Sequence, residues 1–329
     1  MKKYFTSKNI VFILVIISMA IAPLFVNAYW LRVLITAELN MIFAMSLNLL
    51  MGIGGTVSFG HAAFYSIGAY TTACLYYHFG TQYSTNFIFV IIVTALAGLL
   101  LAVPMSRITG RYVTIITLSY AEIVNLIIKN WDKVTQGQMG IVGIPTISIF
   151  GFKLKSKIMF FYFALLFVVI TYVMMQWLVK SKLGRNLQAM RDDPIAAEAM
   201  GIKLFPNKVI IFTISAVFAG IAGSLYAHLM TYVDPGTFNS AISFNCIAIV
   251  VLGGLANFPG TLISALFLSI LPEYLRQFEF LFQYRMIAYG AVLVIVMWLN
   301  HSIPGEKLKS TVVGFFRKIL KKKEVEEVA

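Results

Sequence analysis

Apolar stretches of membrane-spanning length recur along the whole chain. A helix needs about 20 mostly apolar residues to cross about 30 Å of hydrocarbon. About ten stretches approach that length, and they are Ile10–Asn27, Val33–Met51, Val57–Phe79, Phe87–Met105, Tyr112–Ile128, Ile158–Val179, Val209–Tyr232, Ala241–Leu255, Gly260–Pro272 and Tyr284–Asn300. Only 12% of the 329 residues are charged, whereas soluble domains hold about 25%. The sequence therefore predicts an all-α fold, a polytopic membrane helix bundle of about ten transmembrane helices, of which the eighth and ninth are short.

The positions of the basic residues predict how this bundle is oriented. Cytoplasmic loops of membrane proteins are enriched in Lys and Arg, and most of the 26 Lys and Arg fall in segments 1–9, 106–111, 180–208 and 301–329. Ten crossings put these four segments on one side, although five lysines fall in one loop on the other side. We expect both termini in the cytoplasm, a transmembrane domain over 1–300 and a cytoplasmic tail over 301–329. The net charge of +13 then reflects membrane orientation, and no nucleic-acid partner is expected.

Two segments interrupt the helical pattern in matching ways. Residues 51–64 read MGIGGTVSFGHAAF, and residues 252–264 read LGGLANFPGTLIS. Glycine and proline loosen backbone hydrogen bonding, which at membrane depth is tolerated only against protein or a water-lined cavity. Paired interruptions in two halves of a chain indicate a transport pathway, while close packing of helices through small residues is the competing interpretation. The expected pathway residues are Asn48, Gly54, Gly55, Ser58, Phe59, Gly60, His61, Gly253, Gly254, Asn257, Phe258, Pro259 and Gly260.

The chain shows few signs of chemistry of its own. No phosphate-binding loop of the pattern Gly-x-x-x-x-Gly-Lys-Ser/Thr occurs, so a pump would need a gradient or a separate ATPase. His61 has no partner at metal-ligand spacing, and we expect no metal. The pair Asp192 and Asp193 resembles an acidic magnesium-binding cluster, but a second cluster is missing, so we expect no catalytic residues. Glu38 and Glu122 lie inside expected spans, and both a structural hydrogen bond and substrate contact stay open for them.

The segment 180–208 predicts two short helices. Apolar residues recur at i, i+4 and i+7 from Leu183 and form one stripe on a charged helix. Asp193 is placed to cap a second helix over Pro194–Met200, with proline at its first position and Gly201 beyond its end. A helix of about two turns is unstable alone in water. We therefore expect it to dock into a partner, with a solvated loop as the alternative.

Four stretches carry a family resemblance: Leu47–Tyr70, Thr117–Pro145, Arg191–Ile202 and Val251–Gly260. In this order they resemble the motifs of the branched-chain amino-acid ABC transporter permeases of the LivM type, and the resemblance covers most of the chain, roughly residues 47–300. Two residues depart from that pattern. Gln136 stands where many relatives have glycine, and Thr56 stands where many have glutamine.

The resemblance implies a non-catalytic permease subunit of an importer in the bacterial inner membrane. Its implied partners are a second permease subunit, expected to be a paralogue, two cytoplasmic ATP-binding subunits that hold ATP and Mg²⁺, and an extracytoplasmic substrate-binding protein. The chain itself would need no cofactor. The implied ATPase-coupling residues are Arg191, Asp192, Asp193, Pro194, Ala197, Glu198, Ala199 and Gly201. The expected cargo is a branched-chain or related amino acid, and the alternatives are a permease for urea or short amides and a stand-alone carrier or channel.

Overall fold

The computed structural model describes residues 2–276, apart from 109, 111, 150, 151 and 155, together with 290, 291 and 294. The helices are α1 (Lys2–Ile21), η1 (Ala22–Leu24), α2 (Ala28–Asn48), η2 (Leu49–Ile53), α3 (His61–Phe79), α4 (Tyr83–Met105), α5 (Tyr112–Asn130), α6 (Asp132–Thr135), η3 (Gly137–Met139), α7 (Lys157–Lys180), α8 (Lys182–Asp192), α9 (Pro194–Ala199), α10 (Leu204–Met230), α11 (Ser240–Gly253) and α12 (Phe258–Leu275). The strands are β1 (Ile141–Val142), β2 (Ser148–Ile149), β3 (Phe152–Lys153) and β4 (Tyr232–Val233). The prediction of a helical bundle is confirmed for this part of the chain.

Two compact units divide the chain, Met1–Ile270 and Leu271–Ala329. The features discussed below belong to the first unit. The expected boundary between 1–300 and 301–329 falls outside the described residues.

Six of the described helices are long and apolar enough to cross a membrane. They are Ala28–Ile53, Tyr83–Met105, Tyr112–Asn130, Lys157–Lys180, Leu204–Met230 and Phe258–Leu275. Ile10–Leu24 and Ser240–Gly253 are shorter apolar helices, so the expected eighth span is short, as predicted. The ninth is longer than expected, because α12 starts before Gly260 and continues past Pro272. The expected crossing at Tyr284–Asn300 consists almost entirely of residues outside the described part of the chain.

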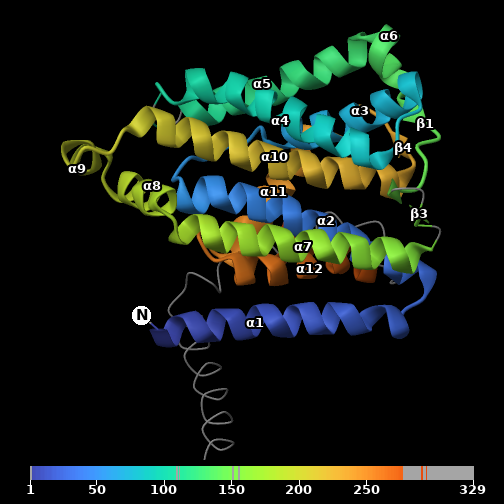
Figure 1. Cartoon of the computed structure of the whole chain (residues 1–329), viewed down its shortest axis with the longest axis horizontal. Coiled ribbons are helices and arrows are strands. Elements are labelled where there is room, and N and C mark those ends of the chain that lie inside the picture. The colour runs from blue at the N-terminus through green and yellow to red at the C-terminus, as the bar shows by residue number, and fades with distance from the viewer. Residues whose placement is uncertain are drawn as a thin grey trace, which may run out of the picture. The chain divides into compact units, whose positions relative to one another are not determined.

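Helix α10 packs against α2, α3 and α4, and it runs through the middle of the first unit (Figure 1). Small residues let it approach its neighbours closely. A Cβ atom added at Gly68 of α3 would overlap the backbone of Gly220, and one added at Gly223 would overlap the carbonyl oxygen of Tyr65. The backbones of α3 and α10 are therefore in direct contact, and larger residues at these glycines would push the two helices apart.

The two ends of the first unit differ in structure. At one end lie α8, α9 and the start of α10, which begins at Leu204, before the expected Val209 (Figure 1). At the other end β1 pairs with β4 in antiparallel fashion, with Ile141 opposite Val233, and β2 pairs with β3. The sequence analysis did not predict these strands.

Candidate functional site

The first interruption follows α2. The helix continues as the π-helical turn η2 and stops at Gly54, whose N–H donates to the carbonyl oxygen of Leu49 at 3.1 Å. Residues 54–60 are not helical, and Gly55 has a φ of 65°, which glycine adopts without steric cost. The interruption is therefore present as predicted. The expected span from Val57 was wrong at its start, because α3 begins only at His61.

The second interruption is shorter than predicted. Helix α11 ends at Gly253 and α12 begins at Phe258, so only residues 254–257 are non-helical. Pro259 and Gly260 were expected to break the helix, but they lie in the first turn of α12, where a proline needs no N–H partner. A Cβ atom at Gly260 would overlap the carbonyl oxygen of Gly253. These two glycines therefore allow close packing between α11 and α12.

Asn48 joins the two interruptions. Its side chain is fully buried. Its Nδ2 donates to the Gly254 carbonyl oxygen at 3.2 Å and to Thr261 Oγ1 at 2.7 Å, while its Oδ1 accepts from the Ala256 N–H at 2.8 Å. A Cβ atom at Gly52 would overlap the backbone nitrogen of Ala256. The two segments that match in sequence thus meet in space.

Ser58 and His61 occupy the buried side of the first interruption. Both residues are fully buried, and Ser58 Oγ has no hydrogen-bond partner among the described residues. The Nε2 atom of His61 lies 2.8 Å from Ser46 Oγ, and its ring stacks on Phe43 with the centroids 5.2 Å apart. His61 is therefore a packed imidazole.

The two carboxylates in the expected spans differ in their surroundings. Glu38 is fully buried in α2, and neither of its carboxylate oxygens has a hydrogen-bond partner among the described residues. Glu122 in α5 accepts a hydrogen bond from Ser240 Oγ at the start of α11. A structural hydrogen bond therefore exists for Glu122, whereas the Glu38 carboxylate has none within the described part of the chain.

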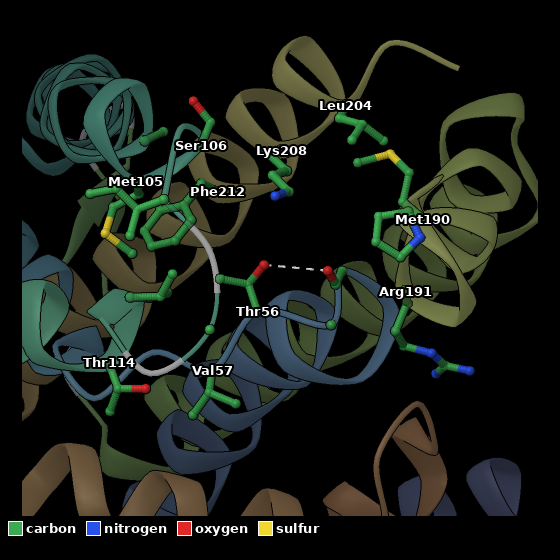
Figure 2. A pocket seen from close by; sticks show the side chains of 17 residues that line it. Thr56, Val57, Met105, Ser106, Thr114, Met190, Arg191, Leu204, Lys208 and Phe212 are labelled. Atoms are coloured by element: carbon green, nitrogen blue, oxygen red, sulfur yellow. Dashed lines mark hydrogen bonds between the residues drawn. The ribbon is translucent and has the colours of Figure 1, made fainter. Parts of the chain in front are cut away.

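A pocket of about 560 Å³ opens beside the first interruption. Residues 54–57, the end of α4, the start of α5, the end of α8 and the start of α10 line it (Figure 2). Gly54 and Gly55 therefore border a cavity. The other expected pathway residues do not line it: Asn48 packs against the second interruption, and Gly60 packs against Thr117 of α5.

The short helix α9 has the capping that its sequence predicts. Oδ1 of Asp193 accepts hydrogen bonds from the N–H groups of Ile195 at 2.9 Å and Ala196 at 3.1 Å. The helix ends at Ala199, one residue before the expected end, and Gly201 follows with a φ of 81°. The helix is thus well formed at both ends.

The surface of α9 is unusually apolar for an exposed helix. Ile195 is 80% exposed and Met200 is 83% exposed. Of the residues expected to couple to an ATPase, Ala197 is buried within this chain, and the others are exposed. A partner would therefore meet the exposed side chains and not that of Ala197.

Arg191, near the end of α8, links the α8–α9 segment to the first interruption. Its Nη1 donates to the carbonyl oxygen of Gly52 at 2.5 Å. Its alkyl chain lies over Gly55, where an added Cβ atom would come within 2.6 Å of Arg191 Cγ. The sequence analysis missed this contact, and it also missed Lys208, which lines the pocket from α10. No local pattern indicates either, because both depend on segments far apart in the chain.

Comparisons with known proteins show which family this chain belongs to. Residues 29–297 match the family described as branched-chain amino acid transport system / permease component. The high-affinity branched-chain amino acid transport system permease protein LivM of Salmonella typhimurium is 32% identical, over 93% of this chain and 78% of the relative. LivM of Escherichia coli is 33% identical, over 89% of this chain and 74% of the relative. A solved structure, PsaBC from Streptococcus pneumoniae in complex with Fab, matches over 90% of this chain and 99% of that chain at 12% identity, with a TM-score of 0.47. The chain therefore belongs to the permease-component family of branched-chain amino acid transport systems.

Proposed function

We propose that this chain is the membrane-spanning permease subunit of an ATP-driven importer for branched-chain amino acids. Its identity of 32–33% to two LivM permeases over most of its length is the observation that carries the proposal. The chain forms part of the transport pathway and does not hydrolyse ATP. ATP and Mg²⁺ bind to partner subunits.

The importer works in the bacterial inner membrane with both termini of this chain in the cytoplasm. Ten crossings over 1–300 and a cytoplasmic tail over 301–329 agree with the distribution of basic residues. The N-terminus of α1 also lies at the same end of the first unit as α8 and α9, which supports one cytoplasmic side for all three (Figure 1).

Two cytoplasmic ATP-binding subunits drive the transport. Helix α9 docks into a groove on one of them, with the exposed side chains of Ile195 and Met200 as its apolar anchors. Arg191 then connects the docked segment to the first interruption through the carbonyl group of Gly52. A second permease subunit, a paralogue of this chain, completes the pathway, and an extracytoplasmic binding protein delivers the amino acid.

The substrate passes near the joined interruptions. Ser58 offers a buried hydroxyl group without a partner among the described residues, and Asn257 offers a half-buried amide. Few polar groups on an apolar wall suit a zwitterion with an aliphatic side chain. Weak contacts also favour release, because a channel that bound its cargo tightly would slow transport.

Purification and uptake measurements test this function. The chain is co-expressed with its candidate partner subunits, purified, and reconstituted in vesicles with the binding protein outside and ATP inside. ATP-dependent uptake of leucine, isoleucine or valine in preference to urea and short amides is expected. Preferred uptake of urea or amides would contradict the substrate assignment, and full uptake by the chain without an ATPase would contradict the importer itself.

Variants of α9 test the docking. Ile195→Glu and Met200→Glu put a charge on each exposed apolar anchor and should reduce co-purification of the ATPase subunits by about tenfold, as for loss of a buried apolar contact. Lys203→Gln is the matched control, because Lys203 is exposed beside α9 but is not one of its apolar side chains. Unchanged co-purification in both glutamate variants would contradict docking through α9.

A further inference from the structure

The pocket beside the first interruption has the size and lining of a small-molecule site. Its volume of about 560 Å³ falls in the range of about 300–1,000 Å³ that is usual for such sites. Apolar side chains from several elements form its walls. Met105 of α4 and Phe212 of α10 are among them (Figure 2), and so is Val113 of α5. An aliphatic group in the pocket would pack against these side chains.

One wall of the pocket carries a cation without a counter-ion. Lys208 is half-buried, and no ion pair or hydrogen bond of its side chain exists within the described part of the chain. The described lining residues include no Asp or Glu. The other cation of the lining, Arg191, is already bound to Asp192 and to the Gly52 carbonyl group. A partly desolvated ammonium group of this kind attracts an anionic ligand group.

Thr56 of the first interruption offers an acceptor for a ligand cation in the same pocket. Thr56 Oγ1 donates its hydrogen to the Gly54 carbonyl oxygen at 3.3 Å, so its lone pairs remain free to accept (Figure 2). The C-terminal end of α4 reaches the pocket at Met105, and the N-terminal end of α10 reaches it at Leu204. The partial charges of these two helix ends have opposite signs. The pocket therefore presents a positive side, a negative side and an apolar wall.

We propose that this pocket is a second amino-acid site on the ATPase side of the importer, where imported substrate binds and slows further import. The carboxylate of an aliphatic amino acid binds Lys208, its ammonium group binds Thr56, and its side chain packs against Met105 and Phe212. This inference rests on the proposed function, because it takes the ligand from the same chemical class as the cargo.

The position of the pocket explains how a ligand there would inhibit. It is lined on one side by residues 54–57 of the first interruption and on another by Met190, Arg191 and Pro194 of the α8–α9 segment. A ligand that contacts both holds them in their present arrangement. The free energy by which the ligand stabilises that arrangement grows as the ligand concentration rises above the dissociation constant. Movement of α9 by the ATPase would then have to displace the ligand.

Uptake into preloaded vesicles tests the inhibition. The complete importer is reconstituted with ATP inside, and the initial uptake of labelled leucine is compared with and without unlabelled leucine inside. Internal leucine should lower the rate about twofold or more once its concentration exceeds the dissociation constant. Internal leucinol, which lacks the carboxylate, should leave the uptake rate unchanged. A wild-type rate that internal leucine leaves unchanged would overturn the proposal.

Two lysine variants assign the effect to the pocket. The ratio of the rates with and without internal leucine should return to about one in Lys208→Gln and should stay at the wild-type value in the control Lys203→Gln. Lys203 is exposed at the start of α10 and does not line the pocket. Equal inhibition in wild type and Lys208→Gln would place the inhibitory site elsewhere.

A direct binding measurement tests this site independently of import, and it also tests whether the ligand is an amino acid or a lipid. Equilibrium dialysis of labelled leucine against the complete detergent-solubilised importer should detect binding that Lys208→Gln loses and Lys203→Gln keeps, even if no uptake is measured. An anionic lipid has the same aliphatic and anionic chemistry. If leucine binds only after anionic lipid is removed, the pocket is a lipid site and the proposal is wrong. Failure of ATP-dependent uptake alone would instead contradict the proposed function.

Discussion

The Nη1 atom of Arg191 lies 2.5 Å from the carbonyl oxygen of Gly52. The last carbonyl groups of a helix have no partner within it and carry partial negative charge, and Gly52 belongs to η2, the end of the helix that begins with α2. Asp192 binds the same guanidinium group at 3.1 Å. One charged side chain thus joins the end of α8 to the point where the membrane helix stops.

Replacement of Arg191 should uncouple ATP hydrolysis from transport. In Arg191→Gln the charged hydrogen bond to Gly52, worth about 1 kcal/mol at a partly exposed site, is lost. The ATPase subunits should still bind α9, but its movement would reach the first interruption less effectively. We expect several-fold less leucine imported per ATP hydrolysed, measured in reconstituted vesicles.

Arg185→Gln is the control for this experiment. Arg185 lies on the same helix, but its Nη1 donates to the carbonyl oxygen of Lys180 at 2.7 Å, which is a local contact. The Arg185→Gln variant should import as much leucine per ATP hydrolysed as the wild type. If Arg191→Gln also keeps the wild-type ratio, the contact with Gly52 has no part in coupling.

Loss of the Asn48 side chain should destabilise the bundle. Asn48→Ala leaves the carbonyl group of Gly254 and the N–H of Ala256 without their partner. Each unsatisfied buried group costs about 1–3 kcal/mol. We expect a clear fall in the melting temperature of the detergent-solubilised complex. Asn40→Ala should have a smaller effect, because Asn40 makes one part-buried hydrogen bond, to Ser269. Equal melting temperatures for the two variants would contradict the bridging role of Asn48.

Local signals explain which parts of this site the sequence predicts. The cap at Asp193 and the turn at Gly201 depend on residues within one short segment, and both are present. The glycine run at Gly54 and Gly55 likewise marks a real interruption. The run Pro259-Gly260 misled for a physical reason: a proline in the first turn of a helix looks the same in sequence as one that ends it.

Contacts between residues far apart in the chain could not be predicted from the sequence. The bridge from Asn48 to Ala256 and the contact between Arg191 and Gly52 each depend on how separate helices pack. A single sequence carries no periodicity that pairs such residues. The strands β1 and β4 were missed because two residues are too few to show the alternation that predicts a strand.

Removal of the α9 cap should weaken ATPase binding. Asp193→Ala deletes the side chain that accepts from the N–H groups of Ile195 and Ala196, and losing such a cap costs about 1 kcal/mol. We expect a several-fold lower affinity of the ATPase subunits, measured by titration against the solubilised permease. Asp193→Ser retains a capping oxygen and should restore most of the affinity. Equal weakening by both variants would indicate that the charge matters and the cap does not.

A methyl group at Gly60 should separate α3 from α5. The Cβ atom of Gly60→Ala would overlap the carbonyl oxygen of Thr117, and the Phe59 N–H donates to Thr117 Oγ1 at 3.1 Å just before it. Backbone atoms on both sides leave no room, so overpacking should cost about 1–3 kcal/mol or more. We expect less folded protein by size-exclusion chromatography in detergent.

The matched substitution for this prediction is Gly236→Ala. Its Cβ atom would meet only Oδ1 of Asp234, at 2.9 Å, and no backbone atom, so that only this carboxylate, which accepts two hydrogen bonds from Thr237, would have to shift slightly. Yield and elution profile of Gly236→Ala should therefore stay close to those of the wild type. A Gly60→Ala variant that folds equally well would mean that α5 can shift away from the first interruption, and the close approach of Gly60 to Thr117 would then not be required for the fold.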